Sequence, residues 1–174
     1  MMKLNLGIGG KKVGKDFIGV DINKGRYTDV VCDLTKLEDK FSKESIDEIY
    51  SRHVIEHFPQ KEIHVILKSW VSLLKPNGKI TLNFPDLDRY VDFYINNKNK
   101  IPVEEFARWI YGNQKDKYDI HKAGFNGKYM TQILTDLGIN VLSVFPAMVG
   151  NGLPRVNKAM IGTEIIGIKY IKKK

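Results

Sequence analysis

The sequence predicts an α/β fold built on a mostly parallel sheet. Short runs rich in Val, Ile and Leu alternate with helical segments, and strands that alternate with helices pair in parallel. These runs are LNL, FIGVDI, DVVCD, IDEIYS and KITLNFP. The last two apolar runs, INVLSVFPAMV and KAMIGTEIIGIKYI, are joined only by GNGLPRVNK, which is too short for a crossover helix. They should therefore form an antiparallel hairpin, which gives about seven strands and an antiparallel end to the sheet.

Four segments have the pattern of helices. In the clearest of them, 60–74, the apolar residues recur with the 3.6-residue period, and Pro76 and Gly78 follow as stop signals. Further helices are expected at about 86–97, 103–111 and 128–137, the last ending at Gly138. We expect the region 86–126 to lie over one end of the sheet.

The composition is that of one globular domain spanning residues 1–174. The chain is 43% hydrophobic and 28% charged, a balance typical of soluble proteins. It has no apolar run of the roughly 18 residues that would span a bilayer, and its N-terminus lacks a signal peptide's apolar core. We therefore expect a cytoplasmic protein without membrane insertion. The single Cys32 cannot form an internal disulfide and is expected to be a buried thiol.

The charge pattern argues against a nucleic-acid partner. The net charge is +8, but part of the excess lies in KYIKKK at the C-terminus, and the other cations are scattered. A nucleic-acid groove usually carries a dense stripe of Lys and Arg with interleaved aromatic residues. The mild excess would instead help to attract an anionic substrate, or it would simply be solvated surface.

The stretch LNLGIGGKKVGKDFIGVDI at residues 4–22 only partly matches a dinucleotide fingerprint. Gly7 and Gly9 fit G-x-G-x-x-G, but Lys12 stands in place of the third glycine, and Asp21 comes early for a ribose-binding acid. A P-loop is excluded because the chain has no G-x-x-x-x-G-K-[ST]. The stretch therefore predicts either a tight turn with a solvated Asp, or a turn that lets a ligand approach the backbone while Asp21 binds a ribose through its two oxygens.

A second acid favours the ligand-binding interpretation. Asp33 follows the next strand, DVVCD, and the carboxyl ends of parallel strands share the edge at which open α/β sheets bind ligands. Asp33 could accept a hydrogen bond from an adenine amine, while the backbone N–H of Leu34 faces a ring nitrogen. The sequence thus predicts a nucleoside site with few features for binding phosphate.

Five blocks in order then resemble the class I S-adenosylmethionine-dependent methyltransferases. They are LNLGIG at 4–9, GVDI at 19–22, DVVCDL at 29–34, SIDEIYSRHVIEHF at 45–58 and LKPNGKITLNFPD at 74–86. The blocks are similar to those of a small, short-linked subgroup associated with bacterial surface-polysaccharide genes. The resemblance implies a Rossmann-like seven-stranded sheet of order 3-2-1-4-5-7-6, with helices on both faces, and S-adenosyl-L-methionine as cofactor.

The resemblance also implies roles for particular residues. Ten positions are carried over as cofactor-binding: Asn5, Gly7, Gly9, Asp21, Ile22, Asp33, Leu34, Ser51, Arg52 and His53. Among them, Asp21 would hold the ribose, and Asp33 with Leu34 would hold the adenine. The chain departs from most class I enzymes at GKKVGKD, which is too short for the usual helix between the glycine turn and the ribose acid.

Three histidines are candidates for catalysis. An attacking hydroxyl benefits from a general base that titrates near neutral pH, which favours imidazole. His53 and His57 flank Glu56 just after the fourth strand, and His121 lies in HKAGF, a loop element that the family shares. Positioning of the turn before Pro59 is the alternative role for His57, and loop packing is the alternative for His121. His64 should be solvated on a helix.

No set of residues has the spacing of a metal site along the chain, and we expect no metal. The leading prediction is a methyltransferase acting on a hydroxyl, or a similar nucleophile, of a small molecule or surface glycan. A nucleic-acid methyltransferase, acting on RNA, is the first alternative. Among nucleic-acid enzymes, those that methylate amino groups of DNA need a [DNS]-P-P-[FYW] loop after the fourth strand, and this chain has SRHV there. The second is a catalytically inactive cofactor-binding module. The apolar final strands could also pair in a homodimer.

Overall fold

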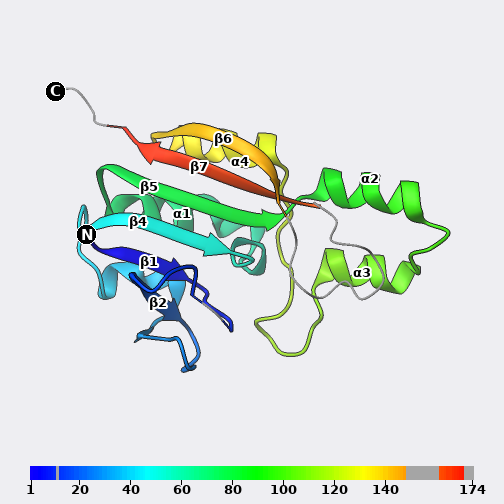
Figure 1. Ribbon diagram of the computed structural model, residues 1–174, viewed down its shortest axis with the longest axis horizontal. Coiled ribbons are helices and arrows are strands. Elements are labelled where there is room, and N and C mark those ends of the chain that lie inside the picture. Colours follow the sequence, from blue (N-terminus) through cyan, green and yellow to red (C-terminus); the bar gives the residue numbers. More distant parts are fainter. Residues whose placement is uncertain (11, 148–160, 171–174) are drawn as a thin grey trace.

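The computed structural model describes residues 1–10, 12–147 and 161–170. Their strands form one seven-stranded sheet of order β3-β2-β1-β4-β5-β7-β6 (Figure 1), so the predicted order is confirmed. The strands are β1 (Lys3–Leu6), β2 (Phe17–Asp21), β3 (Val30–Val31), β4 (Ile46–Arg52), β5 (Leu74–Pro85), β6 (Ile139–Ala147) and β7 (Gly162–Lys169). Neighbouring strands in the part β3-β2-β1-β4-β5 of the sheet pair in parallel, while β7 runs antiparallel to both β5 and β6. The predicted hairpin is therefore present, although its connection at 150–158 lies outside the described residues.

The helices are α1 (Ile63–Leu73), α2 (Leu87–Asn97), α3 (Val103–Tyr111) and α4 (Gly127–Asp136), with the short 3-10 helices η1 (Leu34–Asp39), η2 (Ile55–His57) and η3 (Gln60–Glu62). The start of the predicted 60–74 helix is the separate turn η3. The last residue of that prediction, Leu74, begins β5 instead. Asp86 caps α2 by accepting hydrogen bonds from the backbone N–H groups of Asp88 and Arg89.

One face of the sheet carries the main core. Leu4 and Leu6 of β1 and Ile49 of β4 are fully buried there, with residues of η1, α1 and α4 in the same cluster. Trp70 of α1 is also fully buried, and its Nε1 donates a hydrogen bond to the carbonyl of Leu34, 2.9 Å away. Burying a side chain of this size contributes on the order of 2 kcal/mol or more. The core therefore fixes η1, and with it the strand end that carries Asp33, against α1.

The opposite face is covered differently near the amino end of the chain. The sequence predicts helices on both faces, but η1, α1 and α4 share the first face, and the chain that links β1 to β2 (the 7–16 link) has no helix in its described residues, 7–10 and 12–16. Because strand residues alternate between faces, Asn5 points to the loop side, where its Oδ1 accepts a hydrogen bond from the backbone N–H of Val13 (2.8 Å). The link is too short for a helix and is held by this bond instead.

Beyond the carboxyl end of the sheet, α2 and α3 form a separate projection (Figure 1). They have their own small core, in which Tyr90, Ile101, Trp109 and Ile161 are buried. The rings of Tyr94 and Phe106 stack across the two helices with centroids 4.1 Å apart. This pairing lies within the predicted region 86–126, and α3 leads directly into the loop that carries His121.

Two further predictions concern single features. Cys32 is buried, as expected, and burial raises the pKa of its thiol above the ordinary value. The edge strand β6 exposes Leu142, Val144 and Phe145. Pairing into a homodimer through the final strands stays a prediction. None of the described helices has both the length and the apolar character needed to cross a bilayer.

Candidate active site

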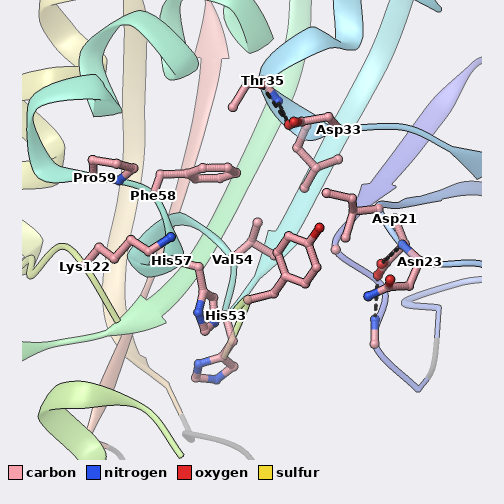
Figure 2. Close-up of a pocket in the computed structure, with 15 residues that line it drawn as sticks. Asp21, Asn23, Asp33, Thr35, His53, Val54, His57, Phe58, Pro59 and Lys122 are labelled. Carbon is pink, nitrogen blue, oxygen red and sulfur yellow. Dashed lines mark hydrogen bonds between the residues drawn. The ribbon is translucent and has the colours of Figure 1, made fainter. Parts of the chain in front are cut away.

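A cavity of about 360 Å³ lies at the carboxyl ends of β1, β2 and β4. The sequence predicts eight of the residues that line it: Gly7, Gly9, Asp21, Ile22, Asp33, Leu34, His53 and His57. Figure 2 shows Asp21 and Asp33 on one side of this pocket and the imidazole groups of His53 and His57 on another. We call the part formed by Gly7, Gly9, Asp21 and Asp33 the carboxylate side. The part formed by His53, His57, Phe58 and Lys122 is the histidine side.

The glycine turn forms the base of the carboxylate side. Gly7 and Gly9 have φ values of +62° and +56°, which residues other than glycine rarely adopt. A Cβ atom at Gly7 would also lie 2.2 Å from Cγ2 of Val54, a pocket residue that follows β4. Around Gly9, by contrast, the space that a Cβ would enter is open. The turn therefore brings backbone to the pocket wall and leaves room beside it for a ligand.

Asp21 presents a carboxylate that is already oriented. Its Oδ2 accepts a hydrogen bond from the backbone N–H of Gly9 (3.3 Å), and its Oδ1 accepts one from the backbone N–H of Asn23 (2.9 Å) (Figure 2). Each carboxylate oxygen has capacity for a further bond, so two vicinal hydroxyls could still donate to this group. The geometry fits the ribose role that the sequence predicts.

Asp33 is oriented in a similar way by the turn that follows it. Its Oδ1 accepts hydrogen bonds from the backbone N–H and the hydroxyl of Thr35, at 2.9 and 2.8 Å, and so caps η1. Both bonds use the same oxygen, which leaves Oδ2 to accept from a ligand amine. Only Val30 and Val31 of the predicted third strand pair with β2, because the chain turns into η1 directly after Asp33.

Four of the predicted site residues do not line the pocket. Asn5 and Ser51 are buried within the sheet, and Arg52 is exposed. Asn5 instead holds the 7–16 link, as described above. His121 does not line the pocket but lies next to His57, which does, with the two imidazole centroids 5.0 Å apart in an edge-to-face arrangement. The strand-end residue that does reach the pocket is His53, which has the positive φ of 52° at the turn out of β4.

Hydrogen bonds fix the imidazoles of His57 and His121 through the same ring nitrogen. Nδ1 of His57 lies 3.2 Å from the carbonyl oxygen of Ile120, and Nδ1 of His121 lies 3.1 Å from that of Trp109. A carbonyl can only accept, so each Nδ1 carries the proton in the neutral ring, and each Nε2 is a free acceptor. Burial lowers the pKa of His121, which favours this neutral form.

Glu56 lies close to both rings, and its carboxyl group is only 2% exposed. Its oxygens have no hydrogen-bond partner among the described residues, although Nδ1 of His53 lies 3.3 Å from Oε1. Burial by itself would raise the pKa of Glu56, but the contact with His53 and the positive charge that His53 and His57 carry when protonated outweigh it, and the pKa is lowered. Glu56 is therefore a buried carboxyl group whose ionised form is favoured by protonated imidazoles beside it.

Backbone hydrogen bonds join the two segments that supply this group. The carbonyl of Glu56 accepts from the N–H groups of Lys122 (2.7 Å) and Ala123 (3.1 Å), and the N–H of His121 donates to Tyr111. Gly112 has a φ of +79°, and a Cβ there would lie 2.4 Å from the carbonyl oxygen of Asp119. The loop between α3 and α4 can therefore close against η2 only with glycine at this position.

Seven lining residues were not predicted from the sequence: Asn23, Thr35, Val54, Phe58, Pro59, Tyr118 and Lys122. Most of them adjoin residues that were predicted, so proximity in sequence to Asp21, Asp33 and His57 could have indicated them. In the sequence, Glu56 attracted notice only as the residue flanked by His53 and His57. Tyr118 has no signal in the sequence, because its loop reaches the pocket only through the tertiary fold.

The comparison with family models decides the family. Residues 5–144 match the model described as a methyltransferase domain. The chain belongs to this methyltransferase family. The comparison with curated proteins finds no match.

Solved structures agree on the fold. A methyltransferase of Methanosarcina mazei, described as SAM-dependent, superposes with a TM-score of 0.67 at 16% identity, over 98% of this chain and 93% of that one. A SAM-dependent methyltransferase of Archaeoglobus fulgidus gives 0.62 at 18% identity, over 97% and 86%. The 1,6-didemethyltoxoflavin-N1-methyltransferase of Burkholderia thailandensis, solved with bound 1,6-didemethyltoxoflavin and S-adenosylhomocysteine, gives 0.60 at 12% identity, over 98% and 71%.

These findings confirm the prediction of a class I methyltransferase that uses S-adenosylmethionine. The pocket is consistent with that cofactor, because the glycine turn offers an open approach and two oriented carboxylates retain free acceptor positions. Membership of the subgroup associated with surface-polysaccharide genes stays a prediction, as do the roles of the individual residues.

Proposed function

We propose that this methyltransferase transfers a methyl group to a hydroxyl oxygen of a small molecule or glycan. The observation that carries this proposal is the composition of the pocket, in which two oriented carboxylates face a group of imidazoles. S-adenosylmethionine, when bound, supplies a methyl group on a positively charged sulfur. Gly7, Gly9, Asp21 and Asp33 would hold it, with Asp21 at the ribose and Asp33 at the adenine.

The histidine side would then receive the acceptor. A hydroxyl is a poor nucleophile until its proton is removed, and in the neutral ring of His57, a pocket residue, Nε2 is the nitrogen that can accept a proton. A base held in this way contributes roughly 10²- to 10⁴-fold to the rate, and aligning the two reactants contributes more. Lys122 adds a cation at the same side, which would favour an acceptor that bears a negative charge.

The nature of the acceptor can be tested by parallel methyl-transfer assays with labelled cofactor. The substrates would be nucleotide sugars, polysaccharide fragments, small hydroxyl compounds and RNA. We expect label on a hydroxyl compound or glycan, as an ether that resists mild base. Label on RNA alone would replace this proposal with the nucleic-acid alternative. Tight binding of S-adenosylhomocysteine without transfer to any acceptor class would favour an inactive binding module.

A further inference from the structure

The group formed by Glu56, His57 and His121 has a second property that general base catalysis does not use. One potential ligand atom from each of the three residues lies within 4.8 Å of the others. They come from two segments, η2 and the loop between α3 and α4, that the backbone bonds of Glu56 hold together. The side chains therefore converge on one point because of the fold and not by chance proximity on a surface.

The hydrogen bonds of the two histidines match those of metal ligands. A histidine that binds a metal usually donates its other ring N–H to a carbonyl or carboxylate, which fixes the ring and aims its lone pair. His57 and His121 both use Nδ1 in this way, toward Ile120 and Trp109. Both Nε2 atoms are thereby left as acceptors with fixed orientation.

Glu56 provides an independent observation. A carboxyl group that is 98% removed from solvent is costly to bury unless a cation or hydrogen bonds compensate it. Among the described residues, neither of its oxygens has a partner that meets hydrogen-bond geometry, although Nδ1 of His53 lies 3.3 Å from Oε1, and Nε2 of His53 is likewise buried without a partner. Such a group in a native structure requires an explanation, and a bound cation is the simplest that its neighbours allow.

We infer that Glu56, His57 and His121 bind a divalent transition-metal ion, with Zn²⁺ as the first candidate. Two imidazoles and one carboxylate are a ligand set of catalytic zinc and non-haem iron sites, which keep at least one coordination position open. His53 contacts Glu56 and would act as a positioning residue for that ligand. This site was not expected from the sequence, because His121 is far from His57 along the chain.

The inference rests on the proposed function for its chemical meaning. His57 lines the pocket, so an open position of the ion on that side could take the acceptor's hydroxyl oxygen and lower its pKa. His57 would then be a ligand rather than a base, and the acceptor class narrows to compounds whose oxygen can coordinate a metal.

Metal binding can be measured on the full chain without any activity assay. Protein treated with a chelator would be titrated with Zn²⁺ by calorimetry and with Co²⁺ by visible absorption, which reports a protein site of low symmetry. We expect one ion per chain, and at least about tenfold weaker binding in Glu56→Gln and in His121→Ala. Mg²⁺, which prefers oxygen ligands, should compete poorly.

Two variants serve as matched controls. His64→Ala removes an exposed histidine of α1, and Glu105→Gln makes the same change at another buried carboxylate outside the group. Both should bind Zn²⁺ as the wild type does. Affinity for S-adenosylhomocysteine, which depends on the carboxylate side, would show that each variant is folded.

The two proposals fail in different ways. Wild-type protein that binds S-adenosylhomocysteine but neither Zn²⁺ nor Co²⁺ would overturn the metal site, and so would Zn²⁺ binding that survives both Glu56→Gln and His121→Ala. Because the wild-type titration needs no variant, misfolding of a variant cannot obscure the answer. Metal binding at these residues without methyl transfer to any oxygen would instead overturn the proposed function. Transfer by metal-free protein would leave His57 as a base.

Discussion

The two sides of the pocket are assembled from the chain in different ways. The carboxylate side comes from the ends of β1, β2 and β3, which are neighbours in the sheet, and Asp21 and Asp33 are each oriented by the backbone N–H two residues beyond them. The histidine side joins η2 to a loop far along the chain, through bonds to the carbonyl of Glu56. The first side follows from local sequence, whereas the second joins His53 and His57, which the sequence also predicts, to a loop that only the whole fold brings beside them.

Gly7 of the carboxylate side lies against Val54, the residue after His53 of the histidine side, and its replacement should have the largest effect. A Cβ in Gly7→Ala would collide with Val54 and force a φ of +62° on alanine. We expect the free energy of unfolding to fall by about 2 to 4 kcal/mol, as measured by chemical denaturation. Gly10→Ala is the control, since a Cβ there enters open space, and it should stay within about 0.5 kcal/mol of wild type. Equal stability of the two variants would contradict this close contact.

Asp21→Asn tests the carboxylate side alone. Hydrogen bonds to a charged group are worth about 1.5 to 3 kcal/mol, so the Kd for S-adenosylhomocysteine should rise by about 10- to 150-fold in calorimetry. Asp16→Asn changes an exposed carboxylate that pairs with Lys3, and it should leave this Kd unchanged. If both variants bind equally well, Asp21 does not contact the cofactor.

Gln60→Ala tests the histidine side. The Oε1 of Gln60 accepts a hydrogen bond from the backbone N–H of Gly124 (3.0 Å), close to His121 in the same loop. Losing a bond worth about 0.5 to 1.5 kcal/mol should lower kcat/KM for methyl transfer by about 2- to 10-fold, with the affinity for S-adenosylhomocysteine preserved. Gln132→Ala removes a comparable bond on α4 and should change neither quantity. A parallel loss of cofactor affinity in Gln60→Ala would show that the two sides are not independent.

Arg52→Ala should have the smallest effect. The family resemblance assigns Arg52 to the cofactor, but the structure places it exposed and outside the pocket lining. A surface substitution of this kind changes free energies by about 0.5 kcal/mol at most, so the Kd for S-adenosylhomocysteine should stay within about twofold in the same calorimetric titration. A larger change would restore Arg52 to the site and extend the carboxylate side toward β4.

The sequence by itself determined the order of elements and the chemistry of the carboxylate side. Alternation of apolar runs with helical periodicity identifies parallel strands, and Asp21 and Asp33 stand where two of those strands end. Both signals are local, because the hydrophobic period of an element and the residues of the turn that ends it lie within a few positions of each other along the chain. The short 7–16 link could also be foreseen, though not that a bond from Val13 to Asn5 would hold it.

Only the tertiary structure decided the histidine side and the way the helices cover the sheet. The joint position of Glu56, His57 and His121 depends on the turn at Gly112 and on bonds between distant segments, neither of which leaves a periodic trace in the sequence. The placement of η1, α1 and α4 on one face follows from which side chains share a core. Residue spacing predicted the carboxylate side because its residues end neighbouring strands, and it could not predict the contact of Glu56 with the His121 loop because these segments are distant in the sequence.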